Sequence, residues 1–375
     1  MIALRAPHLG GARFIRLLEH LGGIEKLFSA GRGQLERAGL HEETIRALSK
    51  PDEALLESDL EWLSSPSHHL LTWESELFPP LLRDIPSPPA ALYVDGDPDI
   101  LWQPQVAVIG SRNPTAGGKD NATDFAGELS RQGMTITSGL AAGIDSIAHA
   151  AALDAGKTTV AVMGTGLDRV YPSSSRGLAV RIRDKGVLVS EFPPGTGAQR
   201  SHFPSRNRII SGLSLGVLVI EAGLRSGTLI TARMAGNQGR DVFALPGSIH
   251  NPMAKGCHRL IRDGAKLVET VEEIMQELAP MAGQLAGELK RQIDLKEMKP
   301  AALPLDNAAQ DPQLDEDPEY RLLWSCLGFD PKPIDSIIEQ SGLTARAVSA
   351  MLLLLELRGK VEAHPGGAYS RKIRG

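Results

Sequence analysis

Short apolar runs separated by helical stretches fill the middle of this 375-residue chain. Each run is rich in Val, Ile and Leu, and such continuous runs indicate strands that are buried on both faces. Strand and helix in turn predict an α/β domain with a doubly wound, mostly parallel sheet. Ligands of such sheets bind beyond the carboxyl ends of the strands. The predicted strands are VAVIG (106–110), MTITSG (134–139), TTVAVMG (158–164), GVLVSE (186–191), GVLVIEA (216–222) and DVFALPG (241–247).

The segments before these strands predict two further parts. Residues 1–65 place leucines at helical spacing between glycine-rich breaks, which indicates a small helical module of the helix-hairpin-helix or SAM kind. We assign residues 66–278 to the strand-containing domain. The stretch from residue 64 to residue 102 is rich in proline and predicts an extended connector that packs on this domain.

The segments after the strands predict a linker and a last module. Residues 279–317 lack a sustained apolar face and are rich in Pro, Gln and acidic residues, which favours a flexible linker. Residues 318–375 contain two helical stretches and then two short strands around HPGG. This order is typical of a winged helix.

Composition fits a protein of the cytoplasm. Cys257 and Cys326 lie far apart and lack metal-ligand spacing, as expected in a reducing compartment without a disulfide framework. Arginines interrupt the apolar residues of the N-terminus, so we predict no signal peptide. The densest apolar run, MLLLLEL at 351–357, is too short to span a bilayer, so no membrane insertion is expected.

Turns of small residues follow four of the predicted strands. Turns of this kind can aim backbone N–H groups and helix N-termini at an anion. Four of them along one edge of a sheet predict an anion-binding rim. The turns are Gly110-Ser111-Arg112, residues 138–143 with Ser138 and Gly139, residues 164–166, and residues 221–228 with Ser226, Gly227 and Thr228.

Three enzyme motifs are approached but not completed. GTGLDR begins like a dinucleotide fingerprint, but Arg169 stands where the third glycine belongs. NPTAGGKD resembles a phosphate loop, but Asp120 replaces the Ser or Thr that binds Mg²⁺. SGTLIT resembles a turn of nucleotide phosphoribohydrolases, but Thr231 replaces the glutamate that glycosidic cleavage requires.

A catalytic triad and a metal site are also disfavoured. Ser138, Asp145 and His149 lack the strand-turn-helix elbow that presents a nucleophile, so we interpret them as a cap and helix side chains. The pair His68-His69 has no partner ligands in the sequence. We therefore expect no catalytic residue, no metal and no cofactor.

The segment QRSHFPSRNRIISGLS, residues 199–214, is basic in a chain whose net charge is −5. Arginine binds phosphate bidentately, and a base can stack on an exposed aromatic ring. Arg200, Arg206 and Arg208 around Phe203 therefore predict contact with single-stranded nucleic acid, with Arg112 on the same rim. In the alternative interpretation the arginines pair with Glu191 and Glu221, and Phe203 packs inward.

The motifs of the central domain resemble those of the DNA processing protein A (DprA, or Smf) family. They are VAVIGSRNPT, TSGLAAGIDSIAHAAAL, SEFPPGTGAQRSHFPSRNRIISGLS, VIEAGLRSGTLITARMAGNQGRDVFALPG and GCHRLIRDGAKLV, in order between about residues 70 and 275. The resemblance implies an extended Rossmann-like domain that binds single-stranded DNA and forms a homodimer. It also implies a role in natural transformation, in which a non-enzymatic binder protects incoming strands and loads the RecA recombinase.

The resemblance also assigns roles to residues. Arg112 is expected to clamp phosphate, and Arg200 lies three positions before the stacking ring of Phe203. Arg206, Asn207 and Arg208 form an RNR motif, Ser226 to Thr228 offer donors, and Lys255 is a further basic contact. The implied DNA-binding residues are Gly110, Ser111, Arg112, Ser138, Gly139, Arg200, Phe203, Arg206, Asn207, Arg208, Ser226, Gly227, Thr228 and Lys255.

The sequence departs from the family pattern at His258, where an asparagine is usual, and in PHLGGAR of the N-terminal module. The resemblance also suggests that residues 257–274 form the dimer or RecA surface, although their apolar side chains fit an ordinary core equally well. Two other functions remain open. One is a nucleotide-processing enzyme of the phosphoribohydrolase type, and the other is a duplex-DNA regulator that acts through the C-terminal module.

Overall fold

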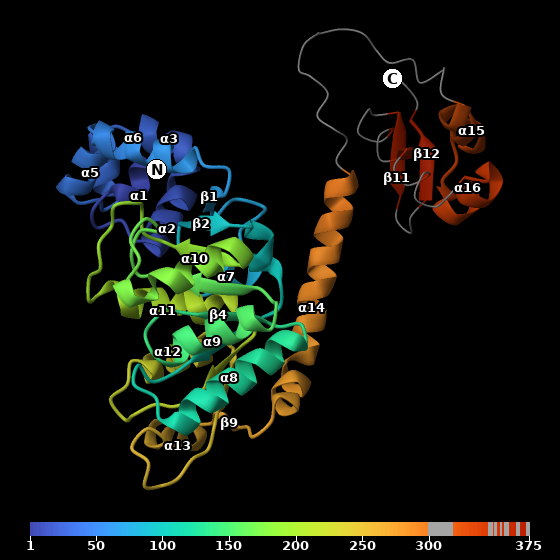
Figure 1. Ribbon diagram of the computed structural model, residues 1–375. Coiled ribbons are helices and arrows are strands. Elements are labelled where there is room, and N and C mark those ends of the chain that lie inside the picture. The colour runs from blue at the N-terminus through green and yellow to red at the C-terminus, as the bar shows by residue number, and fades with distance from the viewer. Residues whose placement is uncertain are drawn as a thin grey trace. The chain divides into compact units, whose positions relative to one another are not determined.

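The structure is a computed structural model that describes residues 1–298, 318–343, 348, 351–352, 355, 360–364 and 368–372 (Figure 1). The chain divides into two compact units, Met1–Met298 and Lys299–Gly375. The first unit holds a large sheet with helices on both faces, and the second is a small α/β module. We describe each unit by itself.

The sheet of the first unit has nine strands in the order β1-β2-β6-β5-β4-β3-β7-β8-β9. The strands from β6 to β9 in this order are parallel, while β1 and β2 are antiparallel additions at one edge. From β3 the chain first moves toward β6 and then returns to β7 on the other side of β3. The doubly wound prediction is therefore confirmed. The strands are β1 His68–Thr72, β2 Ala91–Gly96, β3 Gln105–Ile109, β4 Thr135–Ser138, β5 Thr159–Val162, β6 Val187–Ser190, β7 Gly216–Val219, β8 Asp241–Ala244 and β9 Lys266–Leu267.

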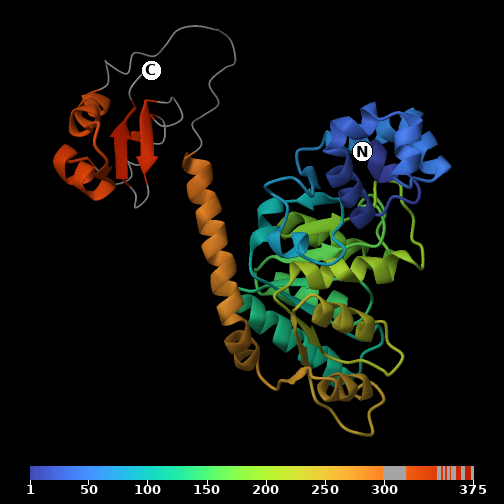
Figure 2. The same ribbon diagram turned by 180° about the vertical axis from the view of Figure 1, so that it is seen from behind.

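Helices cover both faces of this sheet, which Figures 1 and 2 show from opposite sides. Alternate side chains of β3 explain the two layers. Val106 and Val108 pack in one apolar core, and Ala107 and Ile109 pack in another. The first face carries α8 (Ala116–Arg131), α9 (Ile144–Asp154), α10 (Arg176–Lys185) and α14 (Val271–Met298). The second face carries α7 (Pro80–Arg83), α11 (His202–Leu213), α12 (Thr228–Asn237) and α13 (Lys255–Arg262).

The proline-rich stretch from residue 64 to residue 102 is more regular than a connector. It contains β1 and β2, which pair with each other and extend the sheet beyond β6, and a 3₁₀ helix at Pro98–Trp102. Leu92, Tyr93 and Val94 of β2 are fully buried. The prolines flank these strands rather than interrupt them, so the ladder hydrogen bonds are kept.

The N-terminal helices form their own apolar core, as the leucine spacing predicted. Leu17, Leu18 and Leu21 are buried, and α2 ends at Gly22 in the left-handed conformation that glycine favours. Arg5 fastens this module to the sheet domain by donating to Asp59 of α6 and to the carbonyl of Pro194. The helices are α1 Ile2–Arg5, α2 Gly11–Leu21, α3 Ile24–Ser29, α4 Arg32–Arg37, α5 Glu42–Ser49 and α6 Glu53–Leu63.

Helix α14 corrects the predicted linker. Residues 279–298 were assigned to a flexible linker, but they continue the helix that begins at Val271. Ile274, Leu278 and Leu285 recur at helical spacing and are buried in the core that also contains α8 side chains. A few apolar positions therefore suffice to hold the helix on the domain. The rest of the predicted linker, residues 299–317, lies outside the described residues.

The second unit agrees with the winged-helix pattern. Helices α15 (Pro318–Cys326) and α16 (Ile334–Ser341) accompany a sheet of order β10-β12-β11, whose strands are antiparallel. The strands are β10 Lys332–Pro333, β11 Val361–His364 and β12 Ala368–Arg371. Leu323, Ile337 and Leu352 lie in its buried core. The predicted turn at residues 365–367 lies outside the described residues.

Among the residues that the structure describes, no helix is both long enough and apolar enough to cross a membrane.

Candidate nucleic-acid interface

The predicted rim comes together at the carboxyl ends of β3 and β7, where the order of strands reverses. A pocket of about 560 Å³ opens there. Its walls come from the turn after β3, from α11 and from the turn after β7. The predicted residues that line it are Gly110, Ser111, Arg112, Phe203, Arg206, Asn207, Ser226, Gly227 and Thr228.

Arg112 is the exposed cation of the turn after β3. We find no hydrogen bond or ion pair of its side chain within the described part of the chain. The turn beneath it is held on both sides: Ser111 Oγ accepts the N–H of Asn113 at 3.1 Å, and Thr228 Oγ1 donates to the carbonyl of Gly110 at 3.1 Å. The guanidinium of Arg112 is therefore available to a ligand, while its backbone is fixed.

Arg206 has a different role from the one predicted. Its side chain is buried and donates to the carbonyls of Gly139 and Val162, the first lying just after β4 and the second at the end of β5. Burial lowers the pKa of Arg206 to about 10, and the charge of Arg112 lowers it further, while Asp145 acts in the opposite direction. The hydrogen bonds of Arg206 thus tie α11 to two strand ends, and its charge adds to the positive potential of the pocket.

Gly139 and Asp145 complete this buried group. A side-chain carbon at Gly139 would lie 2.6 Å from Nη2 of Arg206 and 2.8 Å from Oδ2 of Asp145, so only glycine fits between them. Asp145 accepts the N–H of Gly139 at 3.2 Å. Burial raises the pKa of Asp145, and Arg206 opposes that rise. Gly139 is therefore a spacer beneath the pocket rather than a pocket surface.

The residues of the rejected triad do not form a catalytic unit. Ser138 Oγ donates to the carbonyl of Val108 at 2.7 Å, and Nδ1 of His149 lies 2.7 Å from Oγ1 of Thr159. Both Ser138 and His149 are fully buried, and burial lowers the pKa of His149 to about 3. Their hydrogen bonds stabilise the sheet beneath the rim.

The first helix N-terminus of the rim is already occupied by the protein. Glu221, just after β7, accepts hydrogen bonds from the N–H of Thr115 at 2.9 Å and from its hydroxyl at 2.6 Å. A side-chain carbon at Gly118 would lie 2.4 Å from this carboxylate. The N-terminus of α8 thus holds a carboxylate of the chain itself, so the expectation that this helix offers its N–H groups to a ligand is wrong.

Phe203 stands at the edge of the pocket and is only partly buried. Its ring covers Gly164, where a side-chain carbon would lie 3.0 Å from Cδ1 of Phe203. The ring of Tyr171 is its aromatic neighbour, with 5.3 Å between the ring centroids. An aromatic ring at the mouth of a cationic pocket is suited to stacking a base.

The remaining predicted residues lie away from the pocket. Arg208 makes a bidentate ion pair with Glu191, at 2.7 and 2.6 Å, and also donates to the carbonyl of Ser87. The alternative interpretation, pairing with Glu191, is thus correct for Arg208. Arg200 and Lys255 are exposed but do not line the pocket.

Arg225 was missed in the sequence. It lies in the turn after β7, between the glycine-rich pieces EAG and SGT, and it is exposed in the pocket wall. Its position within a predicted anion-binding turn was the available signal. We find no hydrogen bond or ion pair of its side chain among the described residues, so it is a second available guanidinium beside Arg112.

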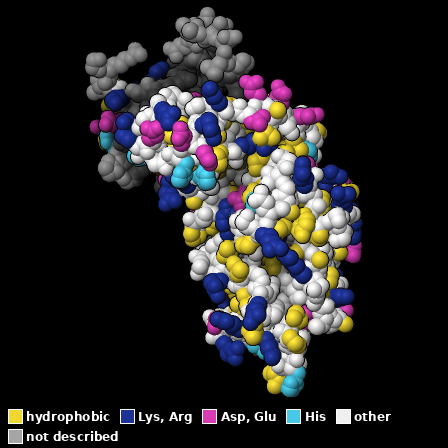
Figure 3. Space-filling model, turned by 90° about the vertical axis from the view of Figure 1, so that its left-hand side faces the viewer, with side chains coloured by type: hydrophobic (Ala, Val, Ile, Leu, Met, Phe, Trp, Pro, Cys, Tyr) yellow, Lys and Arg dark blue, Asp and Glu magenta, His cyan; other side chains and the backbone are white. Residues whose placement is uncertain are grey.

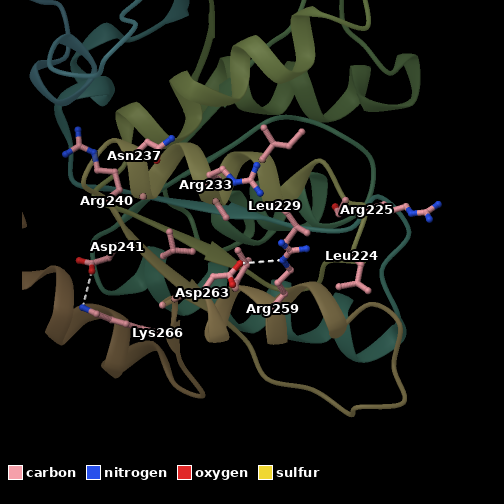
Figure 4. Close-up of a pocket in the computed structure, with 18 residues that line it drawn as sticks. Leu224, Arg225, Leu229, Arg233, Asn237, Arg240, Asp241, Arg259, Asp263 and Lys266 are labelled. Carbon is pink, nitrogen blue, oxygen red and sulfur yellow. Dashed lines mark ion pairs between the residues drawn. The ribbon is translucent and has the colours of Figure 1, made fainter.

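A second hollow of about 580 Å³ adjoins the pocket and shares Arg225, Ser226 and Ile230 with it (Figure 4). Its cations are partly neutralised: Arg259 pairs with Asp263 at 3.5 Å, and Lys266 pairs with Asp241 at 3.0 Å. On the face in Figure 3, Lys and Arg side chains are spread over the body of the molecule with hydrophobic side chains between them. Positive charge therefore extends beyond the pocket, although the whole chain is acidic.

The fold and the pocket define a Rossmann-like domain with a cationic, aromatic-edged pocket at its switch point, followed in the chain by a winged-helix module. The model of the family described as DNA recombination-mediator protein A matches residues 69–279, and the model of the DprA winged helix domain matches residues 307–367. The chain belongs to the DNA recombination-mediator protein A (DprA) family.

Individual relatives agree with this assignment. Protein Smf of Escherichia coli (strain K12) is 42% identical over 335 residues, which are 89% of this chain and 85% of that protein. The X-ray structure of DprA from Streptococcus pneumoniae is 36% identical with a TM-score of 0.66, and the match covers 73% of this chain and 95% of that one. DprA from Helicobacter pylori, whose structure is described in terms of its single-stranded DNA binding mode, is 30% identical with a TM-score of 0.51. That match covers 56% of this chain and 96% of the other.

Proposed function

We propose that this protein binds single-stranded DNA in the pocket between β3 and β7. The observation that carries the proposal is the pair of exposed guanidiniums, Arg112 and Arg225, which stand in one pocket with Phe203 at its edge. Cations without protein partners attract phosphates, and an aromatic edge holds a base whose face is free. Bases in a duplex do not offer their faces, so single strands fit this pocket better.

The geometry divides the binding work among three groups. Arg112 and Arg225 hold successive phosphates, because each is exposed and retains all its donors. Phe203 stacks a base. The buried charge of Arg206 strengthens the attraction without direct contact, since its donors are used by strand carbonyls.

The hydroxyls after β7 brace the pocket. Ser226 Oγ donates to Thr228 Oγ1, which in turn donates to the carbonyl of Gly110. This chain of hydrogen bonds joins the turn after β7 to the turn after β3. We assign Arg200 and Lys255 to outer contacts with the strand, where exposed cations add long-range attraction.

The cellular role follows from the family. We propose that the protein is a cytoplasmic homodimer that protects incoming single strands and delivers them to the RecA recombinase during natural transformation and recombination, and that it acts as a binder rather than as an enzyme. The family motifs support this role. The position of Thr231 in the pocket wall supports the non-enzymatic part, because a threonine supplies no carboxylate for glycosidic cleavage.

The test is the binding of a fluorescent oligo-dT to wild-type protein and to the Arg112→Ala/Arg225→Ala variant, followed by anisotropy at several salt concentrations. We expect the variant to bind weakly and to lose about 1.4 from the slope of log K against log salt, at about 0.7 for each phosphate contact on a single strand. The variant Arg37→Ala/Arg131→Ala, which removes two exposed arginines of α4 and α8, should bind like wild type.

Three results would contradict the proposal. Equal binding by both double variants would place the strand elsewhere. Preference for duplex DNA, lost on removal of residues 299–375, would favour a regulator acting through the winged helix. Release of free base from a nucleoside monophosphate would favour the phosphoribohydrolase type.

A further inference from the structure

Tyr171 is an exposed aromatic residue that the pocket described above does not include. Its side chain is 52% exposed, whereas Tyr93 in the same unit is fully buried. The centroid of its ring lies 5.3 Å from that of Phe203, with the two ring planes tilted by 42°. The two aromatic residues therefore form a continuous pair that leads outward from the pocket edge.

The loop that carries Tyr171 is held by its own hydrogen bonds. The N–H of Gly166 donates to the carbonyl of Thr196 at 2.9 Å, and the N–H of Gly195 donates to Oδ1 of Asp168 at 2.8 Å. Ser175 Oγ donates to the carbonyl of Leu140 at 3.3 Å. An exposed ring on a fixed loop can bind a ligand at a small cost in conformational entropy.

A basic hollow of about 520 Å³ begins beside this ring. It is lined by residues 167–170 of the same loop and by Arg176, Val180 and Arg183 along one side of α10. Two acids share the hollow: Asp168 lies 3.5 Å from Arg169, and Asp95 lies 4.0 Å from Arg183.

Arg176 is the available cation of this hollow. It is exposed at the first turn of α10, and within the described ranges its side chain has no hydrogen bond or ion pair that we can identify. The loop thus presents a stacking surface and then a free guanidinium, the same two chemical groups that the pocket contains.

We infer that Tyr171 and Arg176 extend the single-strand site: the strand leaves the pocket across Phe203, its next base stacks on Tyr171, and a following phosphate binds Arg176. This inference rests on the proposed function. The alternating ring and guanidinium select a polyanion with planar bases, so a single strand longer than the pocket is the ligand. A short oligonucleotide fills the pocket alone, whereas a longer one reaches the extension.

The experiment compares oligo-dT of about 6 and about 20 nucleotides, lengths that bracket the site sizes of simple single-strand folds. Tyr171→Ala should leave the affinity for the short oligonucleotide unchanged and weaken that for the long one at least about 5-fold, as the loss of one stacked base implies. Tyr171→Phe keeps the ring and should match wild type. Equal thermal unfolding of all variants is checked first.

Arg176 is tested by the salt dependence of the long oligonucleotide. Arg176→Ala should lower the slope of log K against log salt by about 0.7. Arg181→Ala is the matched control on the same helix, because Arg181 already pairs with Asp154 at 2.5 Å, and it should leave the slope unchanged.

The outcomes separate this inference from the proposed function. If wild type binds neither oligonucleotide, the pocket and its extension both fail. If Arg112→Ala/Arg225→Ala abolishes binding of both lengths but Tyr171→Ala changes neither, the pocket stands and the extension is wrong. Equal weakening of both lengths by Tyr171→Ala also overturns the extension, because Tyr171 would then only support Phe203.

Discussion

Replacing Arg206 by methionine distinguishes a structural arginine from a DNA ligand. The variant Arg206→Met loses the hydrogen bonds to the carbonyls of Gly139 and Val162, and it leaves Asp145 buried without the charge that opposes its desolvation. Hydrogen bonds from a charged group contribute about 1.5–3 kcal/mol each, and breaking a buried charge pair costs about 3–5 kcal/mol in total. We expect the free energy of unfolding to fall by about 3–5 kcal/mol, a large part of the 5–15 kcal/mol that is usual for a domain.

The assay is urea unfolding of the full chain, followed by far-ultraviolet circular dichroism and checked by calorimetry. Arg112→Ala, an exposed position in the same pocket, should change the free energy by less than about 0.5 kcal/mol. The variant Arg206→Met/Asp145→Asn should regain at least about 1 kcal/mol over Arg206→Met, because no uncompensated carboxylate remains. If Arg206→Met unfolds within about 1 kcal/mol of wild type yet no longer binds DNA, the structural argument is refuted and Arg206 contacts phosphate directly.

Two further predictions concern buried groups near the pocket. The pKa of His149 is lowered to about 3, chiefly by burial and also by Arg206, whereas the unfolded chain binds a proton there near pH 6.5; stability should therefore fall by about 2 kcal/mol between pH 7 and pH 5, and His149→Gln should remove that part of the fall in urea titrations at the two pH values. Gly118→Ala should cost about 1–3 kcal/mol, because its new carbon meets the carboxylate of Glu221, whereas Gly117→Ala meets open space and should cost nothing; equal Tm values for the two variants would contradict the packing of Glu221.

The layout of the sheet was predictable because buried parallel strands are written as continuous apolar runs. The turns after β3 and β7 were predictable for the same reason, since a strand end fixes where a following Gly or Arg lies. The strands β1 and β2 were missed because prolines surround them, although their own residues, such as Leu92 and Val94, are apolar. The helical part of the predicted linker was missed because Leu278 and Leu285 lie seven residues apart and only the structure shows what they pack against.

The site was harder to predict than the fold because arginines look alike in sequence. Arg112, Arg206 and Arg208 all belong to basic motifs, yet one is exposed, one is buried against strand carbonyls and one is paired with Glu191. Their partners come from segments distant in the chain, so neighbouring letters do not reveal them. Arg225 shows the converse, an isolated arginine that the topology of the sheet brings into the pocket.

The fastening of Arg206 to the ends of β4 and β5 also bears on selectivity among DNA sequences. A donor that is held by main-chain carbonyls cannot turn to follow the edge of a base. The groups left for the ligand are guanidiniums, which contact phosphate, and ring faces, which accept any base. The pocket therefore exists in its binding shape before a strand arrives, and it grips every sequence nearly alike, with only the stacking strength of each base left to grade them.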